Sequence, residues 1–220
     1  MRAVIFANGR IENHTQVISQ LRPNDVLIAA DGGAEHCKDI GIQPHIVIGD
    51  MDSISPLLKE ELESAGTNFV TFPEDKDQTD LELALSYAHQ QGANEIVLFG
   101  ILGGRLDMSL ANLLLLAKDE WRNLSIYVID GSDIAFFLGE QDSIKIVGVP
   151  GDIVSLIPLT DQVMGVSTHG LRWHLDDAVL LFGDTRSVSN EMLASSAEVK
   201  IEKGKLFLVH HNSLEGSKEE

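Results

Sequence analysis

The sequence predicts an α/β domain with a mostly parallel sheet, followed by an all-β sandwich domain. Over the first part of the 220-residue chain, short apolar runs alternate with stretches of helical periodicity, as in folds whose parallel strands are joined by crossover helices. From about residue 134, short β-like runs follow one another between closely spaced Gly and Pro residues, a pattern typical of a small antiparallel sandwich or barrel. The natural junction lies at residues 130–133, so the domains are expected to span residues 1–132 and 133–220.

Six apolar runs are predicted as strands of the first domain. Several of them are continuously apolar rather than alternating, as expected for strands that are covered on both faces. The runs are residues 4–7, 26–30, 46–48, 69–72, 96–99 and 126–129.

Two stretches between these runs have apolar residues at helical spacing. In the first, Leu81, Ala84, Leu85 and Ala88 follow the i, i+3, i+4, i+7 pattern, and Gly92 is placed to end the helix. In the second, the apolar positions are Leu106, Leu110, Leu113, Leu114 and Ala117. An apolar stripe of this kind is typical of a helix that packs against a core.

The second domain is expected to consist of short strands without a long helix. Its predicted strands are residues 135–138, 144–147, 153–157, 163–166, 199–201 and 206–209. Residues 215–220 at the end of the chain are expected to be frayed.

The net charge argues against two kinds of binding partner, and the cysteine content excludes an internal disulfide. A net charge of −18 argues against binding to nucleic acid or anionic membrane, which requires a basic surface. It does not forbid a phosphorylated substrate if metal ions and local cations offset the field. The single cysteine, Cys37, excludes an intramolecular disulfide. With no signal-like or membrane-spanning window, the sequence predicts a cytoplasmic protein.

After the strand at 26–30, Asp31-Gly32-Gly33 places two glycines before a helical stretch, where backbone N–H groups and the helix N-terminus suit an anion. Two acidic clusters follow the next two strands: Gly49-Asp50-Met51-Asp52-Ser53 and Asp75-Lys76-Asp77-Gln78-Thr79-Asp80. Carboxylates this close repel one another unless a cation holds them together, and Mg²⁺ prefers such oxygen ligands. Ligands of open α/β folds bind beyond the carboxyl ends of the strands, where these loops are expected to lie. The clusters therefore favour a site for a metal ion and a phosphorylated ligand.

Helix capping is the alternative explanation of the same acidic residues. Asp31 would cap a strand-to-helix turn, Asp52 or Ser53 would begin the helix that contains Leu57, and Asp77 would begin the helix after it. In each of the two acidic clusters, capping explains one carboxylate and leaves the others without a role.

A fourth segment, Gly103-Gly104-Arg105-Leu106-Asp107, offers groups suited to phosphate. The glycines permit close approach of the backbone, and the planar Arg105 fork matches phosphate oxygens. Asp107 is suited to orient that Arg, to bind metal or to cap the following helix. A P-loop, a His or Cys zinc pattern and a Gly-x-Ser-x-Gly nucleophile elbow are absent from the sequence.

Two polar segments stand out among the strands of the second domain. One contains Trp173, which either stacks on a flat or cationic ring or packs at the rim of the core. The other contains Ser189 and Asn190.

Taken together in their order along the chain, these segments resemble the thiamine pyrophosphokinases. The resemblance rests on Asp31–Ala34, Gly49–Ser53, Asp77–Asp80, Gly103–Asp107, Gly170–Trp173 and Ser189–Asn190, and extends over nearly the whole chain. It implies an N-terminal α/β nucleotide-binding domain and a C-terminal β-sandwich. It also implies a homodimer with thiamine sites at the subunit interface.

The resemblance also implies a role for each matching residue. Asp50, Asp52 and Asp80, with Asp77 as an addition, look like Mg²⁺ ligands, and Arg105 looks like the phosphate clamp. Gln78, Thr79 and the glycines at 103 and 104 would lie beside the ATP phosphates, with Asp107 close to the transfer site. Asp31 with Gly32 and Gly33 would shape the catalytic floor. Trp173, Ser189 and Asn190 look like thiamine-side residues contributed across the dimer.

The implied reaction transfers a diphosphate from ATP to the primary hydroxyl of thiamine and releases AMP. Asp107 and Asp80 are both candidates for accepting the hydroxyl proton. The chain departs from the family at Met108, where many members have His. Two alternatives use the same scaffold: a Mg²⁺-dependent phosphohydrolase with water as the nucleophile, and a non-catalytic sensor of nucleotide or thiamine.

Overall fold

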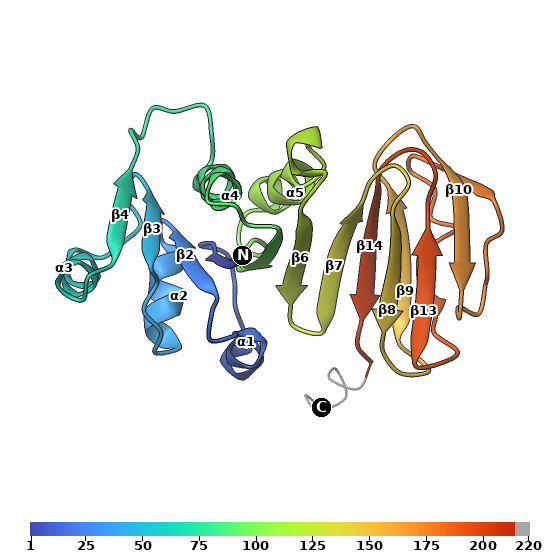
Figure 1. The fold of residues 1–220 in the computed structure, drawn as a ribbon, viewed down its shortest axis with the longest axis horizontal. Helices are drawn as coiled ribbons and strands as arrows, with labels where there is room; N and C mark the ends of the chain where they lie inside the picture. The colour runs from blue at the N-terminus through green and yellow to red at the C-terminus, as the bar shows by residue number, and fades with distance from the viewer. Residues whose placement is uncertain (214–220) are drawn as a thin grey trace. The chain divides into compact units, whose positions relative to one another are not determined.

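The computed structural model describes residues 1–213 and contains two compact units (Figure 1). Unit 1 is Met1–Gly131, and unit 2 begins at Ser132. The expected fraying at residues 215–220 lies outside the described residues. No helix among residues 1–213 combines the length and the apolar character needed to cross a membrane.

Unit 1 is built on a parallel sheet. The strand order is β6-β5-β1-β2-β3-β4, and neighbours pair in parallel throughout (Figure 1). The strands are β1 Arg2–Phe6, β2 Val26–Ala30, β3 Ile46–Gly49, β4 Asn68–Thr71, β5 Glu95–Phe99 and β6 Ser125–Asp130. The helices are α1 His14–Gln20, α2 Gly33–Asp39, α3 Pro56–Ser64, α4 Asp80–Gln90, α5 Leu106–Leu115 and the 3₁₀ helix η1 Asp119–Trp121. The predicted α/β architecture is confirmed.

The strand order reverses at β1, which pairs with β2 on one side and with β5 on the other. Right-handed crossovers then place α1, α2 and α3 on one face of the sheet, and α4 and α5 on the opposite face. The loops that leave β1 and β5 diverge toward these two faces. A crevice at the carboxyl ends of the strands is the expected consequence.

The continuously apolar strands are buried as predicted. Ala3, Val4, Ile5 and Phe6 of β1 are completely inaccessible to solvent, because helices cover both faces of a parallel sheet. The ring of Phe6 stacks on that of Phe99 in β5 with centroids 5.6 Å apart. This core holds the strand ends that carry the acidic clusters.

Burial of the predicted apolar face is found in one of the two helices and not in the other. In α4, the four apolar positions are all buried, which confirms that prediction. In α5, the expectation of a packed apolar stripe is wrong, because Leu106, Leu110 and Leu114 are 84%, 55% and 49% exposed. The helix also ends at Leu115, before Ala117. The spacing of the stripe is correct, but this face of α5 is turned away from the sheet of its own chain.

Unit 2 consists of antiparallel strands in two sheets, which confirms the predicted β-sandwich. Their strand orders are β12-β9-β14-β7 and β11-β10-β13-β8. The strands are β7 Asp133–Leu138, β8 Ser143–Val147, β9 Ile153–Pro158, β10 Gln162–His169, β11 Ala178–Leu181, β12 Asn190–Glu191, β13 Ser196–Lys200 and β14 Leu206–His211. The short strands β11 and β12 were not predicted.

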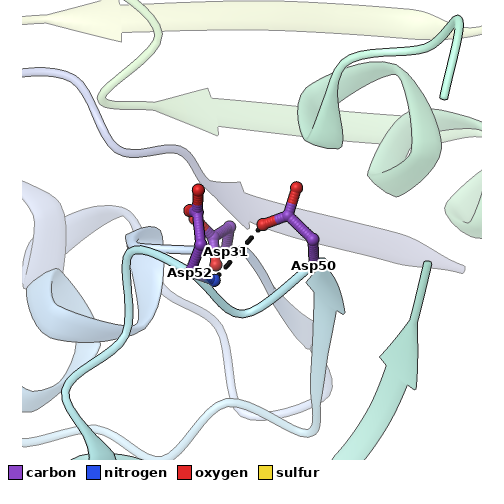
Figure 2. A group of neighbouring side chains, drawn as sticks. All are labelled: Asp31, Asp50 and Asp52. Carbon is purple, nitrogen blue, oxygen red and sulfur yellow. Dashed lines mark hydrogen bonds between the residues drawn. The ribbon is translucent and has the colours of Figure 1, made fainter. Parts of the chain in front are cut away.

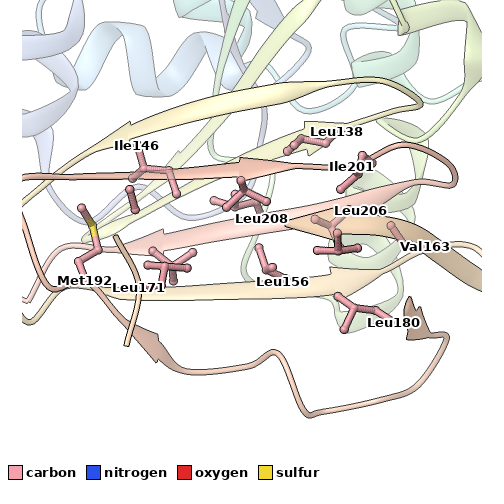
Figure 3. Close-up of a cluster of buried hydrophobic side chains, with 14 residues drawn as sticks. Leu138, Ile146, Leu156, Val163, Leu171, Leu180, Met192, Ile201, Leu206 and Leu208 are labelled. Atoms are coloured by element: carbon pink, nitrogen blue, oxygen red, sulfur yellow. The ribbon is translucent and has the colours of Figure 1, made fainter. Parts of the chain in front are cut away.

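The core of unit 2 lies between inward-facing side chains of these strands (Figure 3). In β13, Ala197 and Val199 are buried while their neighbours are more accessible, the alternation expected for a strand with one solvated face. In the central strand β14, Leu206 and Leu208 are fully inaccessible. Met192, next to β12, belongs to the same cluster and ties the 187–193 segment to the core.

Candidate functional site

A cleft of about 580 Å³ lies at the carboxyl ends of the unit 1 strands. The segments that follow β1, β2, β3, β4 and β5 all contribute to its lining. This is the position in which open α/β folds bind ligands. The acidic residues singled out in the sequence therefore meet at one cleft, although Asp31 and Asp80 are 49 positions apart in the chain.

The helices that follow the acidic clusters are not capped by the carboxylates. The N-cap of α2 is Gly32, that of α3 is Ser55 and that of α4 is Thr79. The Ser55 hydroxyl accepts a hydrogen bond from the backbone N–H of Leu58 at 3.4 Å, and the Thr79 hydroxyl accepts one from Glu82 at 3.3 Å. The capping alternative is therefore wrong, and the carboxylates are left for another role.

Asp31, Asp50 and Asp52 converge on one point (Figure 2). Each can place one carboxylate oxygen so that all three oxygens lie within 4.8 Å of one another. The backbone N–H of Asp52 donates to Oδ1 of Asp50 at 3.2 Å, and Met51 between them has a φ of +69°. This turn keeps both side chains at the cleft.

Gly49 allows the β3 chain to pass beside the other carboxylates. A Cβ at this position would lie 2.8 Å from Cβ of Asp31 and 3.1 Å from Oδ1 of Asp80. Its φ of +153° is also one that residues with side chains rarely adopt. The glycine is therefore required by the packing of the cluster itself.

Asp31 is a buried carboxylate whose charge is only partly compensated. Its residue is 5% exposed, and within residues 1–213 its Oδ1 is buried without a hydrogen-bond partner. Burial raises the pKa of Asp31 above the usual value, and the charges of Asp80 and Asp52 add to this effect; hydrogen bonds from Ser53 and from the Gly32 backbone oppose it. A cation at this point would remove the conflict.

Lys76 supplies one positive charge to the cluster. Its Nζ lies 2.8 Å from Oδ2 of Asp50 and 3.1 Å from Oδ1 of Asp80. The hydrogen bond from Lys76 lowers the pKa of Asp50. The pKa of Asp80 is nevertheless raised, because burial outweighs the effect of Lys76.

The donor set fits a divalent metal ion. It consists of carboxylate oxygens, the ligands that Mg²⁺ and similar hard cations prefer. The buried, unpartnered oxygen of Asp31 and the raised pKa of Asp80 show that one ammonium does not compensate the cluster. Asp31 joins this group in addition to its predicted place on the floor of the site.

Arg105 lines the cleft and is paired with Asp107. Nη2 and Nε of Arg105 donate to the two oxygens of Asp107 at 2.6 and 3.1 Å. This pairing lowers the pKa of Asp107. The side chains are 74% and 66% exposed, so the guanidinium can exchange this carboxylate for another anion at small cost. Of the three roles suggested for Asp107, orienting Arg105 is the one the structure displays.

The other residues predicted for this site differ in where they lie. Gln78, Thr79, Gly103 and Gly104 line the cleft, as does Met108, the position at which the chain departs from the family. Asp77 is exposed, and neither it nor Asp107 or Gly32 is among the described residues that line the cleft. Gly33 packs against the chain itself, since a Cβ there would lie 2.0 Å from the Phe6 carbonyl oxygen.

Several lining residues were not predicted as site residues, among them Asn8, Lys76 and Asn112. Asn8 follows β1, so its place after the first apolar run was a usable signal. Lys76 stands four residues before Asp80 but lies in the loop that precedes α4, so the helical i, i+4 rule gave no signal for this ion pair. Asn112 lies inside an apolar helix and donates to the Ile101 carbonyl at 2.7 Å; its place in the cleft had no sequence signal.

In unit 2, the side chain of Asn190 is hydrogen-bonded to the backbone of Trp173. The Trp173 side chain is largely exposed, and the Arg172 guanidinium lies 5.0 Å from its ring centroid. Asn190 is buried: its Oδ1 accepts from the Trp173 N–H at 3.0 Å, and its Nδ2 donates to the Trp173 carbonyl at 2.6 Å. Asn190 thus holds the segment that presents the ring, while the predicted residue Ser189 is exposed beside it.

Two family models match the chain. One, described as the thiamin pyrophosphokinase catalytic domain, matches residues 18–128. The other, described as the thiamin pyrophosphokinase vitamin B1 binding domain, matches residues 143–206. The first range contains all the acidic clusters and Arg105, and the second contains Trp173, Ser189 and Asn190.

Individual proteins agree with these matches. The thiamine pyrophosphokinase of Bacillus subtilis is 33% identical over 184 residues, which cover 83% of this chain and 85% of the relative. Thiamine pyrophosphokinase 1 of Oryza sativa subsp. japonica is 29% identical over 86% of this chain and 79% of its own length. A crystal structure of the B. subtilis protein has a TM-score of 0.87 and 28% identity, covering 97% of this chain and 100% of that chain.

Proposed function

The chain belongs to the thiamine pyrophosphokinase family, and from this premise we propose how its two units divide the reaction. The enzyme transfers the diphosphate of ATP to the hydroxyl of thiamine, giving thiamine diphosphate and AMP. The observation that carries this conclusion is the match of two family models to separate ranges, each of which contains one of the two predicted groups of site residues.

We assign the cleft of unit 1 to ATP and a divalent metal, with Mg²⁺ as the expected ion. Asp50, Asp52 and Asp80 would hold the metal together with Asp31, and Asp77 would add negative charge at the rim. The support is the oxygen-only donor set and the buried, unpartnered Asp31 Oδ1. When bound, the ion would neutralise phosphate charge and orient the chain of phosphates.

The remaining groups of the cleft would position the transfer. In the reaction, the thiamine hydroxyl oxygen forms a bond to the β-phosphorus of ATP while the bond from that phosphorus to the α–β bridging oxygen breaks. The Arg105 fork would leave Asp107 and bind phosphate oxygens, stabilising charge in the transition state. Gln78, Thr79, Gly103 and Gly104 would lie beside the phosphates. The hydroxyl proton would pass to Asp107 or Asp80.

We assign thiamine binding to the unit 2 segment around Trp173. An exposed indole ring offers a face to the cationic thiazolium of thiamine. Ser189 would contribute its hydroxyl. Asn190 would act mainly by holding the Trp173 backbone, because its carbonyl oxygen and one amide hydrogen are already used there.

We also propose a homodimer. It is supported by the exposed apolar stripe Leu106, Leu110 and Leu114 on one face of α5, since contiguous exposed apolar surfaces are typical of interfaces. The single cysteine, buried in α2, is consistent with the reducing cytoplasm proposed as its location.

The test of the activity is incubation with ATP, Mg²⁺ and thiamine, followed by product analysis by mass spectrometry. AMP is expected to appear together with thiamine diphosphate in equal amounts. Phosphate release that does not require thiamine would instead indicate the phosphohydrolase, and binding without turnover would indicate the sensor.

Replacement of Trp173 by Ala is expected to raise the KM for thiamine about tenfold, from the loss of a stacked cationic ligand. The KM for ATP should stay nearly constant, because Trp173 belongs to the thiamine side of the proposed site. Steady-state kinetics with each substrate varied in turn measure the difference. A matched control is Phe182→Ala, which removes another exposed aromatic residue of the same unit; an equal rise of both KM values in Trp173→Ala would contradict the assignment.

Mixed dimers test whether the site is shared between subunits. Asp52→Asn subunits are mixed with Trp173→Ala subunits under conditions of subunit exchange. If each site combines unit 1 of one subunit with unit 2 of the other, every mixed dimer regains one intact site and activity exceeds the sum of the two variants. Strict additivity would show that each chain forms its own site.

A further inference from the structure

Lys76 is a loop residue with an unexpectedly enclosed side chain. It lies between β4 and α4, and its neighbours Asp75 and Asp77 are exposed, yet its own side chain is 13% exposed. The ammonium is held by two carboxylates, Asp50 Oδ2 at 2.8 Å and Asp80 Oδ1 at 3.1 Å. These two oxygens come from β3's end and from the first residue of α4, so one lysine joins two separate loops of the cleft.

The same two carboxylates belong to the proposed metal site. An ammonium within 3.1 Å of an oxygen repels a divalent cation that binds to that oxygen, since like charges at such distances oppose each other strongly. Asp31 and Asp52 add two further carboxylates, and the Asp31 Oδ1 remains without a partner among the described residues. The single ammonium therefore compensates the cluster only in part.

We propose that Lys76 is a positioning residue that acts as an internal counter-ion of the metal site. Without metal, the Lys76 ammonium offsets part of the negative charge of Asp50 and Asp80. Its ammonium competes with the metal for these oxygens and leaves them when the metal is bound. This inference rests on the metal site of the proposed function.

Lys76 lies where its ammonium, once released from the carboxylates, could bind the phosphates of ATP. The residue lines the same cleft as Asn8, Gly103 and Arg105, in which the phosphates of ATP are proposed to lie. The site can bind metal only in those molecules in which the Lys76 ammonium has moved away from Asp50 and Asp80. The affinity for free metal is therefore reduced in proportion to the fraction of molecules in that state. Phosphates that accept the ammonium raise this fraction, so metal and nucleotide favour each other's binding.

The experiment measures Mn²⁺ binding in the absence of nucleotide, at low ionic strength, by the electron paramagnetic resonance signal of free Mn²⁺. Lys76→Met is expected to bind Mn²⁺ about fivefold more tightly than the unaltered enzyme, because the competing ammonium is gone. The matched control is Lys38→Met, which removes one positive charge from unit 1 at an exposed ion pair with Glu61. Its affinity should change less than about twofold, since distant exposed charges are screened.

Unchanged or weaker binding in Lys76→Met would overturn the inference. A lysine that only stabilised the fold would give weaker binding, because Asp50 and Asp80 would separate. Asp52→Asn distinguishes this failure from failure of the metal site. If Asp52→Asn abolishes Mn²⁺ binding but Lys76→Met does not strengthen it, the counter-ion role alone is wrong. If the unaltered enzyme binds no Mn²⁺, the metal site and the role of Lys76 are both wrong.

A measurement on the unaltered protein does not depend on the folding of Lys76→Met. With ¹³C-labelled lysine, the ε-methylene NMR signal of Lys76 is identified by its loss in Lys76→Arg. This signal is expected to shift as Mg²⁺ saturates the site. A constant Lys76 signal during saturation would overturn the inference.

Discussion

Replacement of Asp52 or Asp80 by Asn is expected to lower kcat by about 10³-fold or more, since the metal they are proposed to hold is worth several kcal/mol in transition-state charge stabilisation. Asn keeps the shape of each side chain but removes the charge that attracts a divalent cation. The measurement is kcat for AMP release at saturating ATP and thiamine over a range of Mg²⁺ concentrations. Asp75→Asn is the matched control, because Asp75 is an exposed carboxylate of the same loop.

The stability of these variants separates a ligand from a structural residue. In the folded protein the pKa of Asp80 is raised, mainly by burial, so its ionised form destabilises the metal-free fold at neutral pH. Asp80→Asn should therefore unfold at the same temperature as the unaltered protein or higher when metal is absent. Asp52 is exposed, and its replacement should change the free energy of unfolding by less than about 0.5 kcal/mol. Inactivity accompanied by a large loss of stability would contradict the metal assignment.

Replacement of Arg105 by Ala is expected to lower kcat about 10²-fold, the usual effect of removing one preorganised donor from a developing charge. The exposed pair with Asp107 should contribute little to stability, so the effect should be confined to catalysis. Arg105→Lys should recover only part of the loss, because an ammonium keeps the charge but lacks the planar fork.

Arg10→Ala is the control for the general loss of positive charge. Arg10 is in an exposed ion pair with Glu12, and Ala retains the Cβ that packs beside Gly103. Near-normal kcat in Arg105→Ala, or an equal loss in Arg10→Ala, would show that Arg105 has no specific contact with the transferring group.

Much of the site was predictable because parallel strands bring their carboxyl ends to one edge. The apolar runs located those ends, and the acidic clusters follow directly after them, so the convergence of Asp50, Asp52 and Asp80 on one cleft required only the α/β fold class. The prediction that thiamine is the acceptor depended on the order of the motifs along the chain. The matches to two family models support that reading.

The pairing of charges was less predictable. Lys76 was visible within an acidic loop, but its partners depend on how two loops from different strands fold against each other. The helix caps were ambiguous for a similar reason, because Asp, Ser and Thr all cap well. Only the backbone path shows that Ser55 and Thr79 take this role.

The two-domain fold class and the strand ends that carry the carboxylates could be predicted from the sequence, as could the suitability of the Arg105 guanidinium for phosphate. These follow from local periodicity and from residue chemistry. Three features could be seen only in the folded chain. Asp31 joins the cluster with an oxygen that has no partner within residues 1–213, Asn190 supports Trp173, and the apolar stripe of α5 faces away from its own sheet. The physical reason is that burial and pairing depend on segments distant in sequence, whereas apolar spacing specifies a face without specifying what covers it.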